Sequence, residues 1–201
     1  ERAGAPWIEL LPSVVDSDRL HPAPKREDGI FTIGWIGTPL NSEYIQPIQE
    51  ALATVTAGGR AQVVLVGSGE VALNDVPLTI RPWIEANEAR DIRSFDVGIM
   101  PLPDAPWERG KCGFKLLQYF ACGIPAVASP VGANQTVVEH AVNGFLASGN
   151  QEWARALIEL RDDPEKRKSM GSAGRKKVER EYSISVTAPK LASLLRRAAG
   201  V

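Results

Sequence analysis

The sequence predicts an α/β domain: an open, mostly parallel β-sheet of about six strands, with helices on both faces and a helical C-terminal tail. Short runs rich in β-branched residues alternate with segments of helical periodicity, which is the pattern of consecutive βαβ units. Of the 201 residues, 44% are hydrophobic, enough to bury a substantial core. Beyond residue 150 the apolar periodicity is helical throughout.

Six short apolar runs are the expected strands, because each is bounded by glycine, proline or polar residues. They span residues 31–37, 61–67, 78–83, 96–102, 125–129 and 144–147. Residues 7–11 could form a further strand, and the turn-rich residues 12–28 are expected to be a linker.

The helices follow from apolar spacing and from signals at their ends. Residues 45–55 carry an apolar stripe at helical spacing, so a crossover helix is expected from near Ser42. Pro47 should mark its first turn, because proline is tolerated there. A second helix, residues 113–122, is expected to end at Gly123.

The C-terminal tail is expected to be helical. Two apolar stripes, at residues 153–160 and 191–198, predict helices, and the basic residues 161–180 between them are expected to form a solvated face.

The chain has 23 Lys and Arg against 24 Asp and Glu, and no run of like charge long enough for a nucleic-acid patch. We therefore expect any charged ligand to be met by a local site.

The two cysteines and the hydropathy indicate a cytoplasmic protein. Cys112 and Cys122 flank a predicted helix, where a rise of about 1.5 Å per residue separates them by roughly 15 Å. They are expected to be reduced thiols. No apolar run approaches the roughly 20 residues that span a bilayer, and residues 1–20 lack the apolar core of a signal peptide.

Three loops are expected to meet at the ligand-binding edge of the sheet, because ligands of open parallel sheets bind beyond the carboxyl ends of the strands. They are residues 37–39, 101–113 and 130–134. Gly37 and Gly132 would let the backbone approach a ligand, and the following helix N-termini would offer N–H groups to a diphosphate. Glycine and proline could equally serve only to turn the chain here.

The segment 109–123 carries the most specific chemistry. If it is helical from about Lys111, then Lys111, Lys115 and Gln118 form a narrow polar stripe on an otherwise apolar helix. An unpaired buried charge is expensive, so an anionic phosphate is a natural partner for the two lysines. The alternative is an ordinary solvated stripe. His21 and His140 are too isolated for a metal site or a catalytic triad.

Four motifs in order resemble the C-terminal domain of group 1 glycosyltransferases, family 4 of the retaining enzymes. They are residues 95–102, 109–123, 124–132 and 143–146, and the likeness extends over about residues 8–198. The resemblance implies one Rossmann-like half of the two-domain GT-B architecture, the half that binds the nucleotide-sugar donor. Residues 1–28 would then be the interdomain linker and the end of an N-terminal domain, residues 29–182 the nucleotide-sugar-binding domain, and residues 183–201 a helix returning toward that N-terminal domain.

The resemblance also implies roles for single positions. Gln118 stands where the family usually has the glutamate that holds the ribose hydroxyls, and Gly110, with Glu108 two residues away, stands where it has the glutamate that contacts the donor sugar. Lys111 and Lys115 are then the candidates for stabilising the departing diphosphate. Trp83 and Ile84 fall where the base pocket forms, with core filling as the alternative for Trp83. The candidate donor-binding residues are Gly37, Thr38, Trp83, Ile84, Gly113, Gln118, Gly132, Ala133 and Asn134.

The implied function is transfer of a sugar from a UDP- or GDP-sugar to an acceptor held by an upstream domain. No cofactor and no metal are expected, and any peripheral membrane association would occur only through that upstream domain. Without it, we expect no transfer. Two alternatives stay open: a non-catalytic relative that only binds sugar nucleotides, and an oxidoreductase domain using residues 66–70 as a truncated dinucleotide fingerprint.

Overall fold

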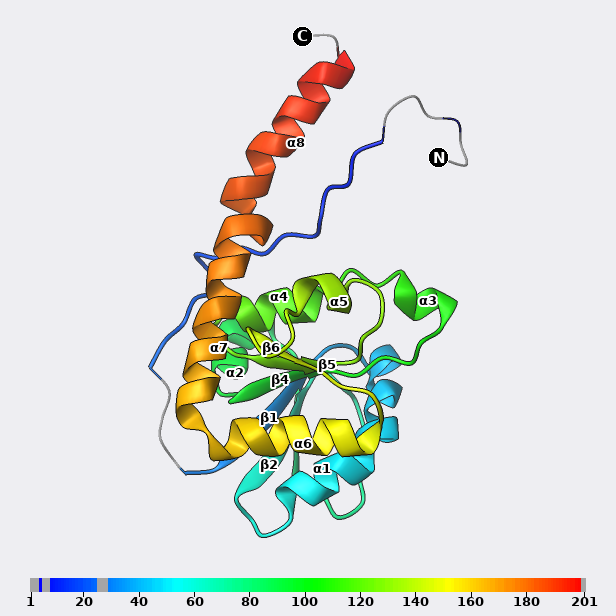
Figure 1. Ribbon diagram of the computed structural model, residues 1–201, viewed down its shortest axis with the longest axis vertical. Helices are drawn as coiled ribbons and strands as arrows, with labels where there is room; N and C mark the ends of the chain where they lie inside the picture. The colour runs from blue at the N-terminus through cyan, green and yellow to red at the C-terminus, as the bar shows by residue number, and fades with distance from the viewer. Residues whose placement is uncertain (1–3, 5–7, 25–28, 200–201) are drawn as a thin grey trace.

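The computed structural model describes residue 4, residues 8–24 and residues 29–199. Its centre is the expected parallel sheet of six strands, and the structure gives their order as β3-β2-β1-β4-β5-β6 (Figure 1). The strands are β1 (Phe31–Ile36), β2 (Ala61–Val66), β3 (Leu78–Arg81), β4 (Val97–Met100), β5 (Ala126–Ala128) and β6 (Gly144–Leu146). Each lies within its expected range.

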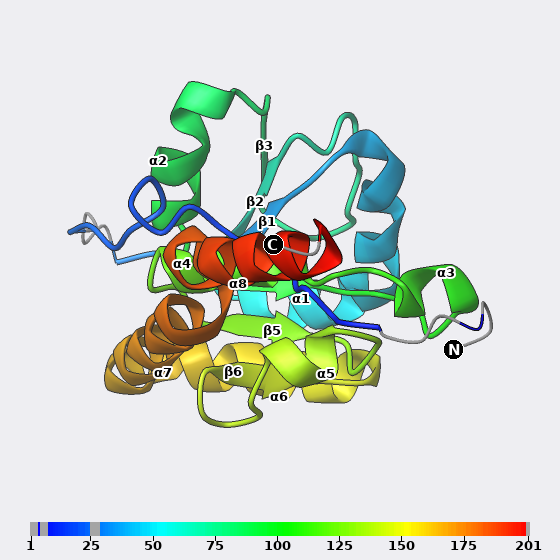
Figure 2. The ribbon, with the colours of Figure 1, turned by 90° about the horizontal axis from the view of Figure 1, so that it is seen from above.

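Helices cover both faces of the sheet (Figures 1 and 2). The α-helices are α1 (Gln49–Thr56), α2 (Glu88–Arg93), α3 (Pro106–Arg109), α4 (Phe114–Ala121), α5 (Asn134–Val137), α6 (Gly149–Asp162), α7 (Pro164–Lys177) and α8 (Ile184–Ala199). Two 3₁₀ segments, η1 (Pro39–Ile48) and η2 (Glu85–Asn87), and a π-helical turn, η3 (Val178–Tyr182), complete the list. Among these helices, none combines the length and apolarity needed to span a membrane.

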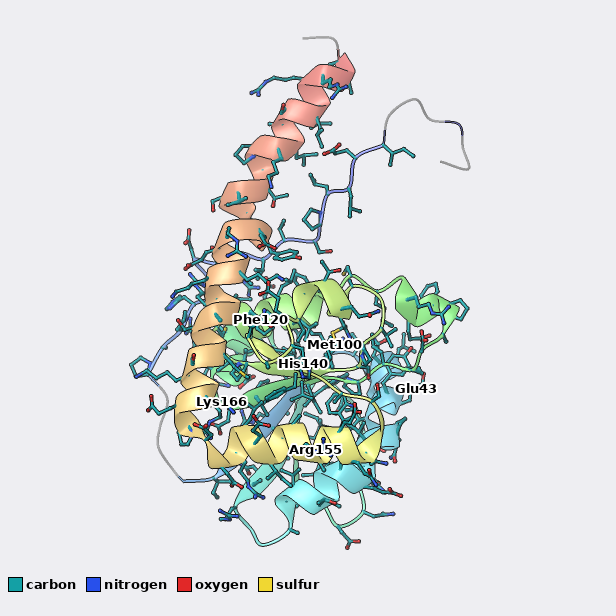
Figure 3. All side chains as sticks on the ribbon, in the orientation of Figure 1. Glu43, Met100, Phe120, His140, Arg155 and Lys166 are labelled. Carbon is teal, nitrogen blue, oxygen red and sulfur yellow. The ribbon has the colours of Figure 1, made fainter. Side chains whose placement is uncertain are left out.

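Two hydrophobic clusters sandwich the sheet, because alternate residues of a strand point to opposite faces. On one face Ile33 and Leu65 pack with α1 and α6, and on the other Val64 and Met100 pack with α2 and α4. In Figure 3, Met100 and Phe120 lie inside the molecule, whereas the exposed Glu43 lies at its edge.

The seating of α4 on the sheet depends on one glycine. A Cβ at Gly98 would lie 2.2 Å from the ring of Tyr119, so only glycine lets that ring reach the strand. The Tyr119 hydroxyl accepts a hydrogen bond from Ile36 N and donates one to Ile99 O, both at 3.2 Å. Burial raises the pKa of this hydroxyl. These contacts fix α4 against the ends of β1 and β4.

The structure corrects three expectations outside the site. The helix expected from Ser42 is a 3₁₀ helix from Pro39 to Ile48, and α1 begins only after Pro47, which has no N–H to donate to an α-helix. No strand forms over residues 8–11; Trp7 lies outside the described residues. The third correction concerns the basic segment.

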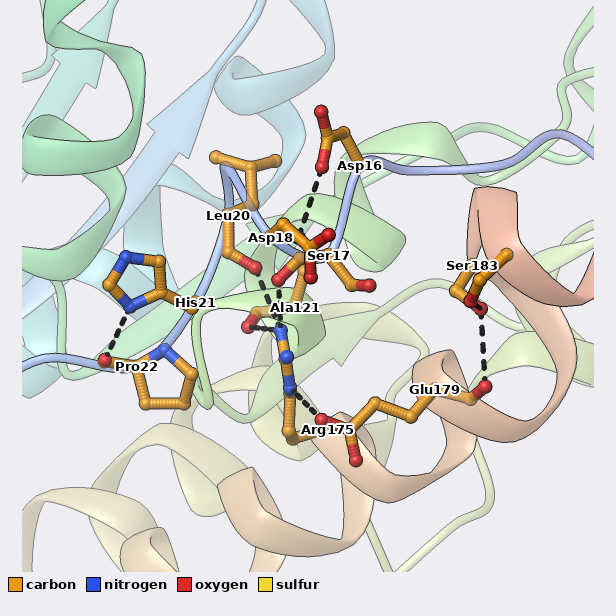
Figure 4. A network of polar contacts seen from close by, with 11 residues as sticks. Asp16, Ser17, Asp18, Leu20, His21, Pro22, Ala121, Arg175, Glu179 and Ser183 are labelled. Atoms are coloured by element: carbon orange, nitrogen blue, oxygen red, sulfur yellow. Dashed lines mark hydrogen bonds and ion pairs between the residues drawn. The ribbon is translucent and has the colours of Figure 1, made fainter.

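Residues 161–180 are not simply a solvated face. The Arg161 side chain is only 11% exposed and donates to Val55 O, and Lys177, 8% exposed, pairs with Glu139. Arg175 donates to three carbonyl oxygens, those of Ser17, Leu20 and Ala121 (Figure 4). Helix periodicity located these side chains on a polar face but could not show that neighbouring carbonyls would cover that face.

Candidate functional site

A cavity of about 530 Å³ opens at the carboxyl ends of β1, β2 and β3, against the start of α4. It is lined by Ile36, Gly37, Thr38, Pro39, Gly67, Trp83, Glu88, Phe114, Lys115 and Gln118. Five of these are candidates from the sequence: Gly37, Thr38, Trp83, Lys115 and Gln118. The cavity lies where open parallel sheets bind ligands.

The N-terminus of α4 forms one wall of this cavity. The residue before the helix, Gly113, has φ +72°, a left-handed conformation that glycine adopts without strain. The first N–H groups of a helix have no intrahelical partner, and they carry the positive end of the helix dipole. This end of α4 is therefore suited to an anion.

Lys115 lies beside those N–H groups, half-buried in the cavity wall. Its Nζ lies 5.4 Å from the centroid of the Trp35 ring, a cation–π distance. A Cβ at Gly37 would approach Lys115 Cε to 2.9 Å, so glycine at 37 leaves room for the lysine stem. Burial, and then the charge of Lys111, lower the pKa of Lys115. A partly desolvated cation of this kind gains most from an anionic partner.

Lys111 is placed differently from the prediction. It is not on the helix, because α4 begins at Phe114 and the left-handed Gly113 interrupts any helical stripe. Its Nζ instead donates to Asn41 Oδ1 at 2.9 Å and lies 5.2 Å from the ring centroid of Tyr44. Its charge still acts on Lys115, so the two cations share one region.

A buried carboxylate adjoins Lys111. Glu108 is 7% exposed, and its Oε1 accepts a hydrogen bond from the Tyr44 hydroxyl at 2.5 Å. This hydrogen bond is the main cause that raises the pKa of Tyr44 to about 12. Tyr44 was not singled out by sequence, because it lies on η1, 64 positions before Glu108.

Trp83 and Glu88 also line the cavity. Trp83 and Ile84 are each 48% exposed, so Trp83 does not fill the core, although Ile84 is not a lining residue. Glu88 Oε1 accepts from Gln118 Nε2 at 2.9 Å and from Trp83 Nε1 at 3.3 Å. Sequence reasoning missed Glu88; its spacing of four residues before the buried Ile92 was the available signal.

The loop after β5 lies outside the cavity lining. Asn134 begins α5, is fully buried and donates to Ser129 O at 3.0 Å. A Cβ at Gly132 would lie 2.5 Å from Arg109 O, so this loop packs against the end of α3. Side-chain atoms of Ala133 and Asn134 lie close to Gly113, each 3.8 Å from where an added Cβ would stand. Gly132, Ala133 and Asn134 therefore support the start of α4 from outside the cavity.

The remaining sequence features are the glycine-containing residues 66–70, the two cysteines and the side chains that could bind a metal. Gly67 lines the cavity, but the chain passes from β2 to β3 without a helix, so residues 66–70 lack the strand–glycine–helix context of a dinucleotide fingerprint. Both cysteines are free thiols; Cys112 is exposed and Cys122 buried. Over the described residues, no group of three or more His, Cys, Asp or Glu side chains is arranged to hold a metal ion.

Comparison with known proteins decides the family. The family model "Glycosyl transferases group 1" matches residues 28–163, more than half of the chain. This chain belongs to the group 1 glycosyltransferases. Within the family it corresponds to the C-terminal domain, as the resemblance implied.

Individual relatives give the extent of the likeness. A "GDP-mannose-dependent monoacylated alpha-(1-6)-phosphatidylinositol monomannoside mannosyltransferase" of Corynebacterium glutamicum is 30% identical over 218 residues, covering 95% of this chain and 56% of that protein. A "D-inositol 3-phosphate glycosyltransferase" of Thermobispora bispora is 31% identical over 133 residues, covering 65% of this chain and 30% of that protein. The chain thus spans about half or less of these curated relatives.

A solved structure supports the fold. The Anabaena protein Alr3699/HepE in complex with UDP-glucose superposes with a TM-score of 0.73 at 18% identity, covering 94% of this chain and 57% of that one. At this identity the likeness concerns the fold alone.

Proposed function

We propose that this chain is the donor-binding domain of a retaining glycosyltransferase, and that its cavity holds a UDP- or GDP-sugar. One observation carries the proposal: the cavity at the carboxyl edge of the sheet is bounded by the N-terminus of α4 and by the half-buried Lys115. Helix N–H groups and a desolvated lysine together match a diphosphate. The cavity volume lies within the ordinary range for small-molecule sites.

Lys115 and Lys111 would act on the leaving group. When the bond between the sugar's anomeric carbon and the diphosphate oxygen breaks, negative charge develops on that oxygen. Two cations held in place before the reaction stabilise this charge without reorganising. Lys115 lies in the cavity wall, whereas Lys111 is held at the side by Asn41, so Lys115 is expected to contribute more.

Trp83 would hold the base. Its half-exposed ring lines the cavity beside Gly67, and aromatic faces stack on any nucleobase. Stacking does not distinguish uracil from guanine. UDP is supported by the sugar nucleotide in the Anabaena structure, and GDP by the name of the Corynebacterium relative.

Calorimetric titration with UDP, GDP and NAD, in buffer containing EDTA, tests the proposal. We expect UDP or GDP to bind and NAD not to bind. Binding of NAD alone would favour the dinucleotide alternative. Binding of UDP or GDP that begins only after Mn²⁺ or Mg²⁺ is added would contradict the metal-independent site.

Transfer itself would need the acceptor-binding half of a GT-B enzyme. Positioning of two reactants supplies roughly 7 to 11 kcal/mol of barrier reduction, and a lone donor domain forfeits most of it. We therefore expect product only when this chain is joined to its upstream domain, and at most slow donor hydrolysis otherwise. Binding without turnover in the joined protein would favour the non-catalytic alternative.

A further inference from the structure

We propose that Arg19 is a positioning residue that acts through Glu88: it neutralises this carboxylate and so allows the cavity to bind a diphosphate. The inference rests on the function proposed above and adds residues 15–22, here called the entry segment, to the site. Glu88 lines the cavity, and its side chain is only 7% exposed. A buried carboxylate opposes an anionic ligand, because like charges repel most strongly where water is excluded.

The hydrogen bonds within the cavity wall do not remove the charge of Glu88. Its Oε1 accepts from Gln118 Nε2 and from Trp83 Nε1, and both donors are uncharged side chains. Its Oε2 accepts from Arg19 Nη2 at 2.5 Å, in an ion pair. Over the residues that the structure describes, Arg19 is the only cation in ion-pair contact with Glu88. Arg19 is not a lining residue, so the charge of this wall is balanced from behind.

The sum of formal charges at the cavity depends on this pair. The lining contains one cation, Lys115, and one carboxylate, Glu88, so their charges of +1 and −1 cancel. Arg19 adds a positive charge and makes the sum +1. Because the Coulomb energy of an anionic ligand follows the sum of the charges around it, a docked Arg19 favours binding of the diphosphate.

The backbone of the entry segment holds Arg19 in this place. Asp16 Oδ1 accepts from the N–H groups of Asp18 and Arg19, both at 3.0 Å, which closes a tight turn. Leu20 is 1% exposed, and Arg175 donates to its carbonyl oxygen at 2.7 Å (Figure 4). The Arg19 side chain therefore extends from an ordered turn, and a movement of this turn would withdraw it from Glu88.

Ligand binding and the placement of the entry segment are consequently coupled. If a docked Arg19 favours the diphosphate, a bound diphosphate must favour the docked segment by the same factor. We expect UDP or GDP to slow hydrogen exchange of the Leu20 amide, which donates to Asp16 O at 2.9 Å, severalfold in wild type. The Lys166 amide, bonded to Asp163 Oδ1 at the start of α7, is the control and should exchange at an unchanged rate.

Calorimetry with UDP, GDP, UMP and GMP, in EDTA and at one ionic strength, tests the charge balance. For the base that binds wild-type protein, Arg19→Gln should weaken diphosphate binding about tenfold. It should weaken monophosphate binding only about threefold, because a ligand with less charge is repelled less by the uncovered carboxylate. Arg19→Lys keeps the positive charge and should keep the diphosphate affinity within about threefold of wild type.

Arg60→Gln is the matched control. Arg60 also pairs with an acid, Asp162, but its side chain is 69% exposed. It directly precedes β2, so it lies at the end of the sheet opposite the cavity. This variant loses the same charge as Arg19→Gln and should keep wild-type affinity for both ligands. Urea unfolding checks that each variant is folded before titration.

Several results would overturn the assignment while nucleotide binding stands. One is wild-type affinity in Arg19→Gln, and another is a loss in Arg19→Lys as large as in Arg19→Gln. Equal losses for the monophosphate and the diphosphate would show that Arg19 only orients the wall. Exchange of the Leu20 amide at a rate independent of nucleotide would remove the coupling, and this measurement on wild type applies even if Arg19→Gln does not fold. If neither UDP nor GDP binds wild type, the proposed function fails, and this inference with it.

Discussion

The two ends of α4 have the same backbone signal and opposite surroundings. Gly113 at the start and Gly123 after the end both adopt a left-handed conformation, at φ +72° and +73°. Around Gly113 the nearest atom to a Cβ would be 3.5 Å away, whereas at Gly123 it would be Pro22 Cγ at 3.1 Å. A left-handed glycine thus bounds α4 at each end, and the residues packed around each glycine decide whether that end can meet a ligand.

The closed end, which is the C-terminus of α4, packs against residues of α7. A Cβ on Gly171 of α7 would lie 2.0 Å from Gly123 O, and Arg175 donates to Ala121 O at 2.7 Å. Arg175 thus satisfies the carbonyl of Ala121, one of those that a helix leaves free at its C-terminus, and Gly171 packs against the backbone just beyond it. The open end has the cavity and Lys115 instead.

The largest effect is expected at the closed end. Gly171→Ala should lower the free energy of unfolding by about 3 kcal/mol or more, because the new methyl group meets a backbone oxygen that cannot move alone. Gly113→Ala should cost only about 1 to 2 kcal/mol, because its site has room and only the left-handed conformation is strained. Urea unfolding of both variants measures the difference, and equal losses would contradict it.

The open end should respond in ligand binding rather than in stability. Lys115→Ala should weaken UDP or GDP binding by about 1.5 to 3 kcal/mol, and Lys111→Ala should fall at the lower end of that range. Lys168→Ala, an exposed lysine of α7, is the control and should leave the affinity unchanged. Calorimetric titration of wild type and the three variants at the same ionic strength measures these affinities. Wild-type affinity in Lys115→Ala would return both lysines to a solvated role.

The pH dependence of binding should identify Lys115. Its pKa lies below the usual 10.5, so in the free protein it loses its charge earlier than an exposed lysine as pH rises. Affinity for the diphosphate should fall through that lowered pKa, because ligand binding favours the charged form. The free energy of unfolding of the free protein should rise over the same pH range, because deprotonation removes the cost of burying the positive charge of Lys115. Titrations between pH 7 and 10 should show the affinity loss in wild type and not in Lys115→Ala.

The smallest effect concerns the two thiols. Cys112, exposed beside the open end, should react with iodoacetamide, whereas burial raises the pKa of Cys122 to about 12 and should protect it. Bound UDP or GDP should slow the reaction of Cys112 severalfold, and mass spectrometry of the labelled peptides reads both sites. Labelling of Cys112 at a rate independent of nucleotide would separate this loop from the ligand.

Sequence periodicity predicted the sheet and the end of α4 because both depend on local patterns. The six strands are continuous apolar runs, and Gly123 followed by Pro125 is a short-range stop signal. Each can be read within about ten residues. Of the three loops expected at the ligand-binding edge, residues 37–39 after β1 line the cavity, because parallel strands end on one side, whereas residues 101–113 and 130–134 do not line it.

The errors arise where distant segments meet. Arg175 seemed solvated because its carbonyl partners at Ser17 and Leu20 lie more than 150 positions away. Glu88 reaches Gln118 across 30 positions, and Tyr44 reaches Glu108 across 64. Lys111 was assigned to the helix because amphipathic spacing alone does not show where Gly113 turns left-handed.

A parallel β-bridge joins Val15 to Ser183. Val15 N donates to Tyr182 O, and Ile184 N donates to Val15 O, so the segment that precedes the sheet is tied to the start of α8. A displacement of residues 8–14 is therefore transmitted to α8 through these two backbone hydrogen bonds, without a change in the sheet. The amide protons of Val15 and Ile184 should exchange with solvent in concert, as parts of one opening unit.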